Sequence, residues 1–175
     1  MHPIKHFLTI TKHRHKVMAH CFKVGLFWQG LCHDISKYSP VEFWRGAKYF
    51  QGNRSPQAKE RELFGYSAAW LHHKGRNKHH FEYWTDSDAN GNTVAVKMPA
   101  KYLAEMVCDR IAASKIYLKK DYTNSSPLNY FYSKNDMHLM HPQTAQDLER
   151  FLLFLAEKGE KYTFKRLKKY VKDYK

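Results

Sequence analysis

The chain of 175 residues is poor in cysteine and has no long apolar run. Cys21, Cys32 and Cys108 show no CxxC spacing, so we expect small buried thiols and neither a disulfide framework nor a zinc finger. No stretch approaches the ~20 apolar residues that a membrane span needs, and the N-terminus lacks the pattern of a signal peptide. We therefore expect a cytoplasmic protein that has no membrane partner.

Acidic residues are also scarce. Asp and Glu number 16 against 30 Lys and Arg, which gives a formal net charge of +14. Such an excess favours anionic partners, such as nucleic acid or small phosphorylated molecules, although a solvated basic surface without a partner is the simpler alternative. With 43% hydrophobic residues, the chain is expected to fold as a single domain over residues 1–175.

The local signals are mostly those of helices. Ser39-Pro40-Val41-Glu42 has the form of a capping box, and Ser55-Pro56 and Pro99 place proline where helices begin. The sequence predicts an all-α bundle of about six or seven helices. Besides the helix that begins at Ser39, we expect a first helix over Thr9–Val24, which Gly25 ends. The further segments expected to be helical are Ser55–Lys74, Pro99–Lys120, Pro142–Glu157 and Thr163–Tyr174.

Two segments differ from the other predicted helices, one as a loop and one through its many lysines. Thr85 to Lys97 contains Asn90-Gly91-Asn92 and is expected to be a loop with at most a small hairpin. Thr163 to Tyr174 is rich in lysine and has one apolar stripe, which predicts an amphipathic helix docked on the domain. A contact of its lysines with nucleic acid is the alternative interpretation of that tail.

The pair His33-Asp34 is the strongest chemical signal, because it offers a nitrogen and an anionic oxygen ligand to one divalent cation. His13 lies on the first expected helix, and Val17 follows it on the same face. Asp109 stands at the edge of an apolar stripe, and its helical position alone favours an ordinary salt bridge with Arg110 or Lys115.

Together these segments resemble the HD superfamily of metal-dependent phosphohydrolases. The resemblance rests on His13 with Val17, on His33-Asp34-Ile35-Ser36-Lys37 and on Asp109-Arg110. It implies a metal held by His13, His33, Asp34 and Asp109, with His20 as the rival first ligand. The chain also looks like an uncharacterised small bacterial and phage family with HD-like patterning, through its segments 28–31, 33–40 and 70–80; that likeness supports the fold and implies no activity.

Two double histidines, His72-His73 and His79-His80, lie close together with Arg76 and Lys78 between them. In the HD superfamily, extra histidines at this place hold a second metal, and His73 and His80 are the candidates here. His72, His79, Arg76 and Lys78 are the candidates for substrate binding. A basic surface loop with solvated histidines is the simplest alternative.

Hydrolysis of a phosphoester needs a group that takes a proton and cations that hold the phosphate. Asp34, Lys37 and Glu42 are the candidate catalytic residues, with Lys37 also a phosphate ligand and Glu82 a weaker candidate. The expected function is metal-dependent hydrolysis of a nucleotide or other small phosphoester, with Mn, Co, Ni, Mg, Zn or Fe as the ion. The alternatives are a non-enzymatic basic nucleic-acid-binding helical module and a di-iron oxygenase of HD type.

Overall fold

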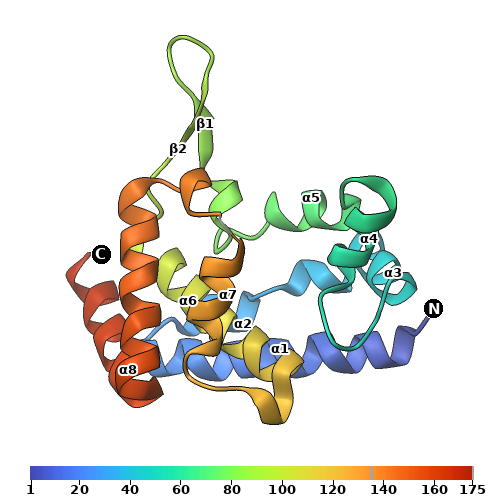
Figure 1. The fold of residues 1–175 in the computed structure, drawn as a ribbon, viewed down its shortest axis with the longest axis horizontal. Helices are drawn as coiled ribbons and strands as arrows, with labels where there is room; N and C mark the ends of the chain where they lie inside the picture. Colours follow the sequence, from blue (N-terminus) through green and yellow to red (C-terminus); the bar gives the residue numbers. More distant parts are fainter. Residues whose placement is uncertain (135, 175) are drawn as a thin grey trace.

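The fold is all-α, as the sequence predicts, in a computed structural model that describes residues 1–134 and 136–174. These residues form eight α-helices, several single 3₁₀ turns and one small hairpin (Figure 1). The helices are α1 (Pro3–Val24), α2 (Phe27–Cys32), α3 (Pro40–Lys48), α4 (Pro56–Phe64), α5 (Ala68–Lys74), α6 (Ala100–Leu118), α7 (Ser126–Lys134) and α8 (Pro142–Asp173).

Helices α1, α6 and α8 build the core. α6 runs through the middle of the molecule, with α1 beneath it and α8 at one side (Figure 1), and it packs against both. Leu103, Val107 and Ile111 of α6 are fully buried, and α1 and α8 add further buried apolar side chains. The apolar stripe expected on α6 ends earlier than predicted, because Leu118 in the last turn is 41% exposed.

The helix boundaries follow the local chemistry only in part. α1 begins at Pro3, six residues before the predicted start, and ends at Gly25, whose left-handed backbone (φ 84°) closes the helix as expected. Residues 55–74 form two helices and not one, because Gly65 adopts φ 77° and ends α4. The Ser67 hydroxyl then caps α5 by accepting a hydrogen bond from the Trp70 amide.

The expected capping box at Ser39 is wrong. Ser39 does precede α3, with Pro40 in the first turn, but its hydroxyl makes no cap hydrogen bond. The Glu42 carboxylate, which would complete such a box, is directed to histidines of α5 instead. A tertiary contact has therefore replaced the local one.

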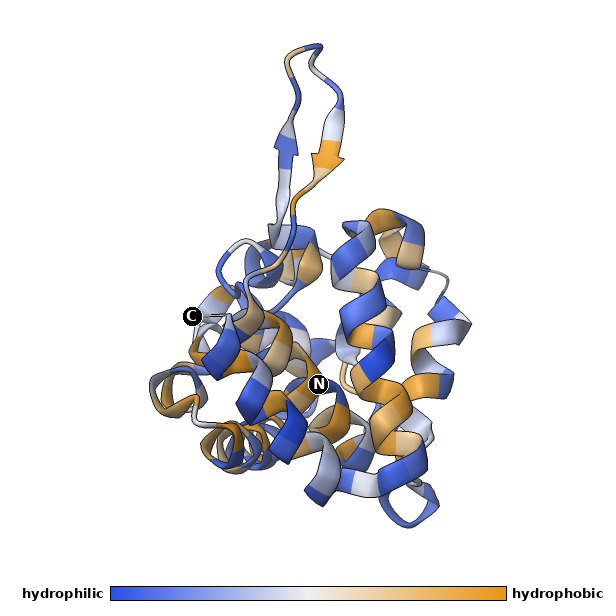
Figure 2. Ribbon diagram, turned by 90° about the vertical axis from the view of Figure 1, so that its left-hand side faces the viewer, coloured by the Kyte–Doolittle hydropathy of each residue, from blue (hydrophilic) through white to orange (hydrophobic). Residues whose placement is uncertain are grey.

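The segment 85–97 contains the hairpin, as predicted. β1 (Thr85–Ser87) and β2 (Thr93–Ala95) pair antiparallel and project from the helical body (Figures 1 and 2). Gly91 has φ 81° in the connecting turn. The Asp88 carboxylate accepts hydrogen bonds from the amides of Asn90 and Asn92 and so orders the turn.

The expected C-terminal helix is the second half of α8. Gly159 has non-helical dihedral angles and produces a kink there, where the sequence predicts the end of a helix. Beyond it, Phe164, Leu167 and Val171 are buried against the core, which confirms the amphipathic docking, whereas Tyr174 is 65% exposed.

Two smaller sequence expectations have different outcomes. Cys21 and Cys108 are buried thiols, as expected, but Cys32 at the end of α2 is exposed. Among the described residues, the helices are all too short or too polar to cross a membrane.

Candidate metal centre

His13, His33, Asp34 and Asp109, which the HD resemblance implies as ligands, converge in the structure. The His13 Nε2 atom lies 2.9 Å from Asp109 Oδ1 and 3.7 Å from Asp34 Oδ2. The His33 Nε2 atom lies 3.4 Å from Asp34 Oδ2 and 3.7 Å from Asp109 Oδ1. Separations of this size suit ligands that share one cation, since each bond to it is about 2 Å long.

Three elements bring these side chains together. His13 comes from the middle of α1, Asp109 from α6, and His33-Asp34 from the turn after α2. Asp34 has a left-handed backbone (φ 54°), which is uncommon for a residue other than glycine. The Arg14 side chain donates a hydrogen bond to the His33 carbonyl (3.1 Å) and so ties this turn to α1.

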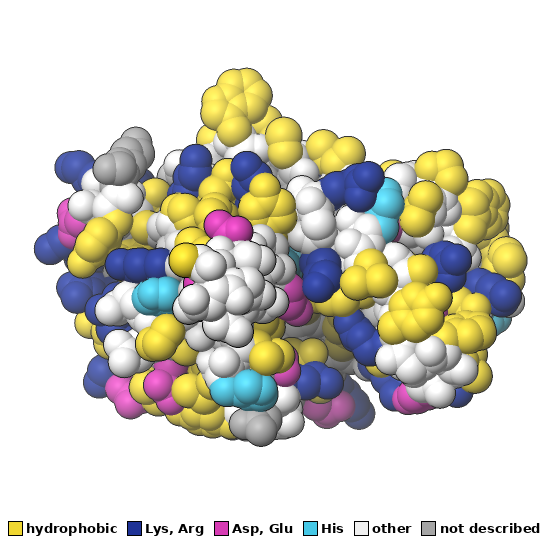
Figure 3. All heavy atoms as spheres, turned by 90° about the horizontal axis from the view of Figure 1, so that it is seen from above, with side chains coloured by type: hydrophobic (Ala, Val, Ile, Leu, Met, Phe, Trp, Pro, Cys, Tyr) yellow, Lys and Arg dark blue, Asp and Glu magenta, His cyan; other side chains and the backbone are white. Residues whose placement is uncertain are grey.

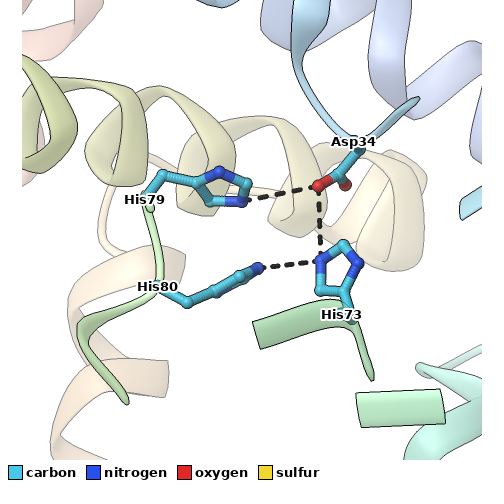
Figure 4. Close-up of side chains that lie close together, drawn as sticks. All are labelled: Asp34, His73, His79 and His80. Atoms are coloured by element: carbon cyan, nitrogen blue, oxygen red, sulfur yellow. Dashed lines mark hydrogen bonds and ion pairs between the residues drawn. The ribbon is translucent and has the colours of Figure 1, made fainter. Parts of the chain in front are cut away.

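A second group lies on the other side of Asp34. It consists of His73, His79 and His80 (Figure 4), and one ligand atom from each of these three and from Asp34 lies within 4.8 Å of the others. The Nε2 atoms of His73 and His79 are 3.3 and 3.5 Å from Asp34 Oδ1, and His80 Nε2 is 2.9 Å from His73 Nε2. His79, expected to bind substrate, is thus part of the candidate metal centre.

The buried Asn77 amide shapes the turn that carries His79 and His80. Its nitrogen donates hydrogen bonds to the His73 carbonyl (2.8 Å) and to the Ser36 hydroxyl (2.8 Å). These bonds fold the chain back immediately after α5, so that His73 from the helix and His79 and His80 from the turn face one another.

Asp34 joins the two groups. Its Oδ2 atom faces His13 and His33, whereas its Oδ1 atom faces His73 and His79. A carboxylate in this position can bridge two cations, and two-ion sites commonly separate their ions by about 3.5–4 Å. The arrangement could therefore hold two divalent ions, one on each side of Asp34.

Two further carboxylates orient the histidines from behind. Glu105 of α6 accepts hydrogen bonds from the Nδ1 atoms of His33 (2.9 Å) and His79 (3.2 Å), and Glu42 of α3 accepts one from His73 Nδ1 (2.7 Å). With Nδ1 directed to a carboxylate, the Nε2 atom of each ring faces Asp34 and is the atom left to bind a cation once it carries no proton. This carboxylate–histidine pairing is the usual support of a metal-binding imidazole.

Several atoms at the centre of this cluster have no hydrogen-bond partner. Among the described residues they include the Nε2 atoms of His13, His33 and His79 and the Oδ1 atom of Asp34. Buried polar groups are normally satisfied, and each one left without a partner costs about 1–3 kcal/mol. The Nε2 atoms of His13 and His33 belong to one candidate ligand group, and His79 Nε2 and Asp34 Oδ1 belong to the other, so these atoms fit two cations, one on each side of Asp34.

The charges also favour a cation. Asp34 and His33 are at most 2% exposed, and although burial opposes the charged form of Asp34, His33 and Lys37 hold its pKa well below the usual range. Burial also opposes the charged form of His33 and acts to lower its pKa. The carboxylates of Asp34, Asp109 and Glu105 outweigh burial and raise the pKa of His33 well above its ordinary value. Without a metal, a proton on His33 therefore supplies positive charge next to these carboxylates. A bound divalent ion would displace that proton and supply the positive charge itself.

His80 and His73 of this group differ in the direction in which their pKa values are shifted. Burial, together with its neighbours His79 and His73, lowers the pKa of His80 well below its ordinary value. The pKa of His73 is raised, because Asp34 and Glu42 outweigh the effect of burial. His80 is thus a neutral ring at neutral pH, and neutral imidazole is the form that binds metal.

Of the other residues that the sequence singles out, Lys37 contacts the cluster, whereas His20 and His72 lie outside it. His20 is directed away from the cluster, with Nδ1 donating to the Cys108 carbonyl (3.2 Å), whereas His13 lies beside Asp34 and Asp109. Lys37 Nζ lies 2.5 Å from Asp34 Oδ2. His72 is hydrogen-bonded to Glu42 (2.7 Å) and lies outside the candidate ligand groups.

The remaining candidates are not brought into the cluster. Arg76 is exposed and donates to the His72 carbonyl (3.3 Å), and the Lys78 ammonium lies over the Tyr83 ring. Glu82 is largely buried with one oxygen lacking a partner, and burial raises its pKa. The alternative that the histidine-rich segment is a solvated surface loop does not hold, because His73 and His79 are buried.

Sequence reasoning missed Glu105. It lies one helical turn before Asp109 on α6, so the two carboxylates share a face of that helix. That spacing of four residues was the available signal, because a second carboxylate among the apolar residues of this helix is costly to bury without a partner. The partner, His33, lies 72 residues away in sequence.

Comparison with known proteins places the chain in a family without an assigned activity. Residues 2–153 match a family of unknown function, DUF5662. The chain belongs to this family. The matched range includes every residue of the candidate metal centre, so the centre lies within the part that defines the family. No curated protein and no solved structure matches the chain.

Proposed function

We propose that this member of DUF5662 is a metal-dependent phosphohydrolase of the HD type, acting on a nucleotide or another small phosphoester. The observation that carries the proposal is the position of Asp34, whose two carboxylate oxygens face two separate groups of histidines. The order His13, His33-Asp34, His73, His79-His80, Asp109 along the chain also agrees with the HD resemblance, in which extra histidines lie between the His-Asp pair and the last aspartate.

Each part of the cluster has a role in this chemistry. Bound divalent ions would supply Lewis acidity toward the phosphate and would lower the pKa of a coordinated water. His13, His33, Asp34 and Asp109 would hold one ion, and His73, His79 and His80 would hold the other together with Asp34. Glu105 and Glu42 keep the histidine rings in the required orientation.

Lys37 is the residue best placed to hold the phosphate. Its ammonium contacts Asp34 Oδ2, yet 24% of its side chain remains exposed, so it lies at the boundary between the cluster and solvent. Burial lowers the pKa of Lys37, but Asp34 and Asp109 outweigh that effect and raise it, which keeps the group cationic. Glu42 fits a positioning role better than the role of a base, because both of its oxygens already accept hydrogen bonds from His72 and His73.

The test is a screen of nucleoside mono-, di- and triphosphates and simple phosphoesters with Mn²⁺, Co²⁺, Ni²⁺, Mg²⁺ or Zn²⁺. Asp34→Ala should abolish turnover, because it removes a ligand of both proposed ions. Asp86→Ala, which removes an exposed carboxylate on the hairpin, is the matched control and should be fully active. Turnover that survives in Asp34→Ala after chelation would refute the mechanism.

A di-iron oxygenase is the second candidate, favoured by the number of histidines in the centre. Five histidines and two aspartates face the two proposed ion positions, and nitrogen-rich sites suit iron. Expression with iron under air separates the two functions. Bound iron with substrate-dependent oxygen uptake would favour the oxygenase, whereas hydrolysis with Mn²⁺ or Mg²⁺ in the absence of oxygen would favour the phosphohydrolase.

A nucleic-acid-binding module is the third candidate, and it rests on the basic surface. Lysine and arginine side chains occur over much of the face seen from above (Figure 3), and the second half of α8 exposes Lys165, Lys168, Lys169 and Lys172. In that case His33→Ala would leave binding to an oligonucleotide intact, and charge reversal along α8 would abolish it.

A further inference from the structure

A basic cavity lies on the face of α1 that does not carry the candidate ligands. It has a volume of about 430 Å³ and is lined by Lys12, His15, Lys16, Ala19, His20 and Lys23 of α1, Lys115 of α6 and Glu160 of α8. None of these residues belongs to either candidate ligand group. A cavity of this volume lies within the range of small-molecule sites, about 300–1,000 Å³.

Its charge is strongly positive. Four lysines and one glutamate leave three net positive charges, and Glu160 already forms an ion pair with Lys115. Lys12, Lys16 and Lys23 form no ion pair with any carboxylate of residues 1–134 and 136–174. Ammonium groups that converge on a concave surface without a counter-charge attract an anion more strongly than isolated surface charges do.

Two of the four lysines are held in place. The Lys115 ammonium is fixed by Glu160 and lies 5.3 Å from the centre of the Tyr122 ring, and Tyr122 donates a hydrogen bond to Glu160 (3.4 Å). The Lys23 ammonium lies 5.2 Å from the centre of the Phe164 ring. Side chains that are ordered beforehand lose less conformational entropy when a ligand binds.

The floor of the cavity is uncharged at neutral pH. The His20 ring packs at a tilt of 39° against the Phe164 ring and donates a hydrogen bond from Nδ1 to the Cys108 carbonyl. Burial lowers the pKa of His20 to about 4, so the lysines provide the positive charge. The walls come from three helices, α1, α6 and α8, and the cavity is open to solvent, so a small anion can enter it directly.

We propose that this cavity binds a small phosphate-bearing anion of about the size of a nucleotide. The lysines of α1 and Lys115 would hold the phosphate groups, and the Glu160 carboxylate would accept a hydrogen bond from a hydroxyl or amine of the same ligand. The site is separate from the candidate metal centre and does not depend on the function proposed for that centre.

The experiment is calorimetric titration with sodium tripolyphosphate and with ATP, in EDTA so that divalent metals are excluded. The test variant is Lys16→Glu with Lys23→Glu. The matched control is Lys165→Glu with Lys172→Glu, which makes the same change of net charge on the exposed side of α8. Circular dichroism verifies that both variants are folded.

We expect saturable binding that the test variant weakens by about tenfold or more and the control by less than about twofold. Asp34→Ala should bind both anions as the wild type does, because the metal centre is not involved. The proposal is overturned if neither anion binds, if both double variants weaken binding equally, or if Asp34→Ala abolishes binding. Binding restricted to a labelled oligonucleotide of about 20 nucleotides would also overturn it and would indicate a nucleic-acid surface.

Discussion

The two supporting carboxylates allow a sharp prediction about metal binding. Glu105 contacts a histidine of each group, His33 at 2.9 Å and His79 at 3.2 Å, whereas Glu42 contacts only His73 of the proposed ligands. Both Nδ1–H donors share the Oε1 atom of Glu105, whose Oε2 atom accepts a hydrogen bond from the Gln29 side-chain amide (2.8 Å). Glu105→Gln removes the negative charge that strengthens both bonds to the rings, and its NH₂ group must face either the Gln29 amide or the two Nδ1–H donors.

Loss of such a partner usually lowers metal affinity by about 10–100-fold, which is roughly 1.4–2.8 kcal/mol. We therefore expect Glu105→Gln to lower the affinity for both proposed ions. Glu42→Gln should lower the affinity only for the ion proposed to bind His73, His79 and His80. Calorimetric titration of each variant with Mn²⁺ resolves the two binding steps. Wild-type affinities in Glu105→Gln, or the same pattern of loss in both variants, would refute this division of roles.

Three other predictions concern pH and packing. Metal affinity should rise with pH until His33 has lost its proton, because Asp34 and its neighbours raise the pKa of His33 and the ion must displace that proton; titrations at several pH values measure this. Acid should destabilise the fold as the pH falls from 6.5 towards 4, because burial lowers the pKa of His20 to about 4 and the unfolded chain takes up the proton first. Protonation of His20 accounts for on the order of 2–3 kcal/mol of this loss of unfolding free energy. In chemical denaturation, the unfolding free energy of His20→Gln should therefore change less with pH than that of the wild type. Gly46→Ala should lower the unfolding free energy by about 1–3 kcal/mol, because its Cβ would collide with the His6 ring; an unchanged melting temperature would contradict this contact.

The sequence predicted the parts of the site that depend on short-range order. His13 and Val17 lie on one face of a helix, and His33-Asp34 marks an abrupt change from apolar to polar residues, so both could be recognised without the fold. The all-α class and the hairpin at 85–97 also follow from local patterns. Asp109 could be included only through the family resemblance, since its spacing equally suits a salt bridge.

The parts that sequence reasoning missed depend on contacts distant in the chain. Glu42 leaves its expected cap because His72 and His73, about 30 residues later, offer buried hydrogen-bond donors. The helix expected over 55–74 breaks because Gly65 can adopt a left-handed backbone, and Ser67 then restarts the chain as α5. This break, followed by the turn at Asn77, places His79 and His80 opposite His73, an arrangement that helical periodicity does not predict.

The most direct test of the two-ion centre is a crystal structure of the protein with Mn²⁺, with the ions located by anomalous scattering. We expect two peaks about 3.5–4 Å apart on either side of Asp34, each about 2 Å from its nearest ligand atoms. One peak should contact His13, His33 and Asp109, and the other His73, His79 and His80. The absence of any peak within the cluster at saturating Mn²⁺, Zn²⁺ and Fe²⁺ would contradict the account.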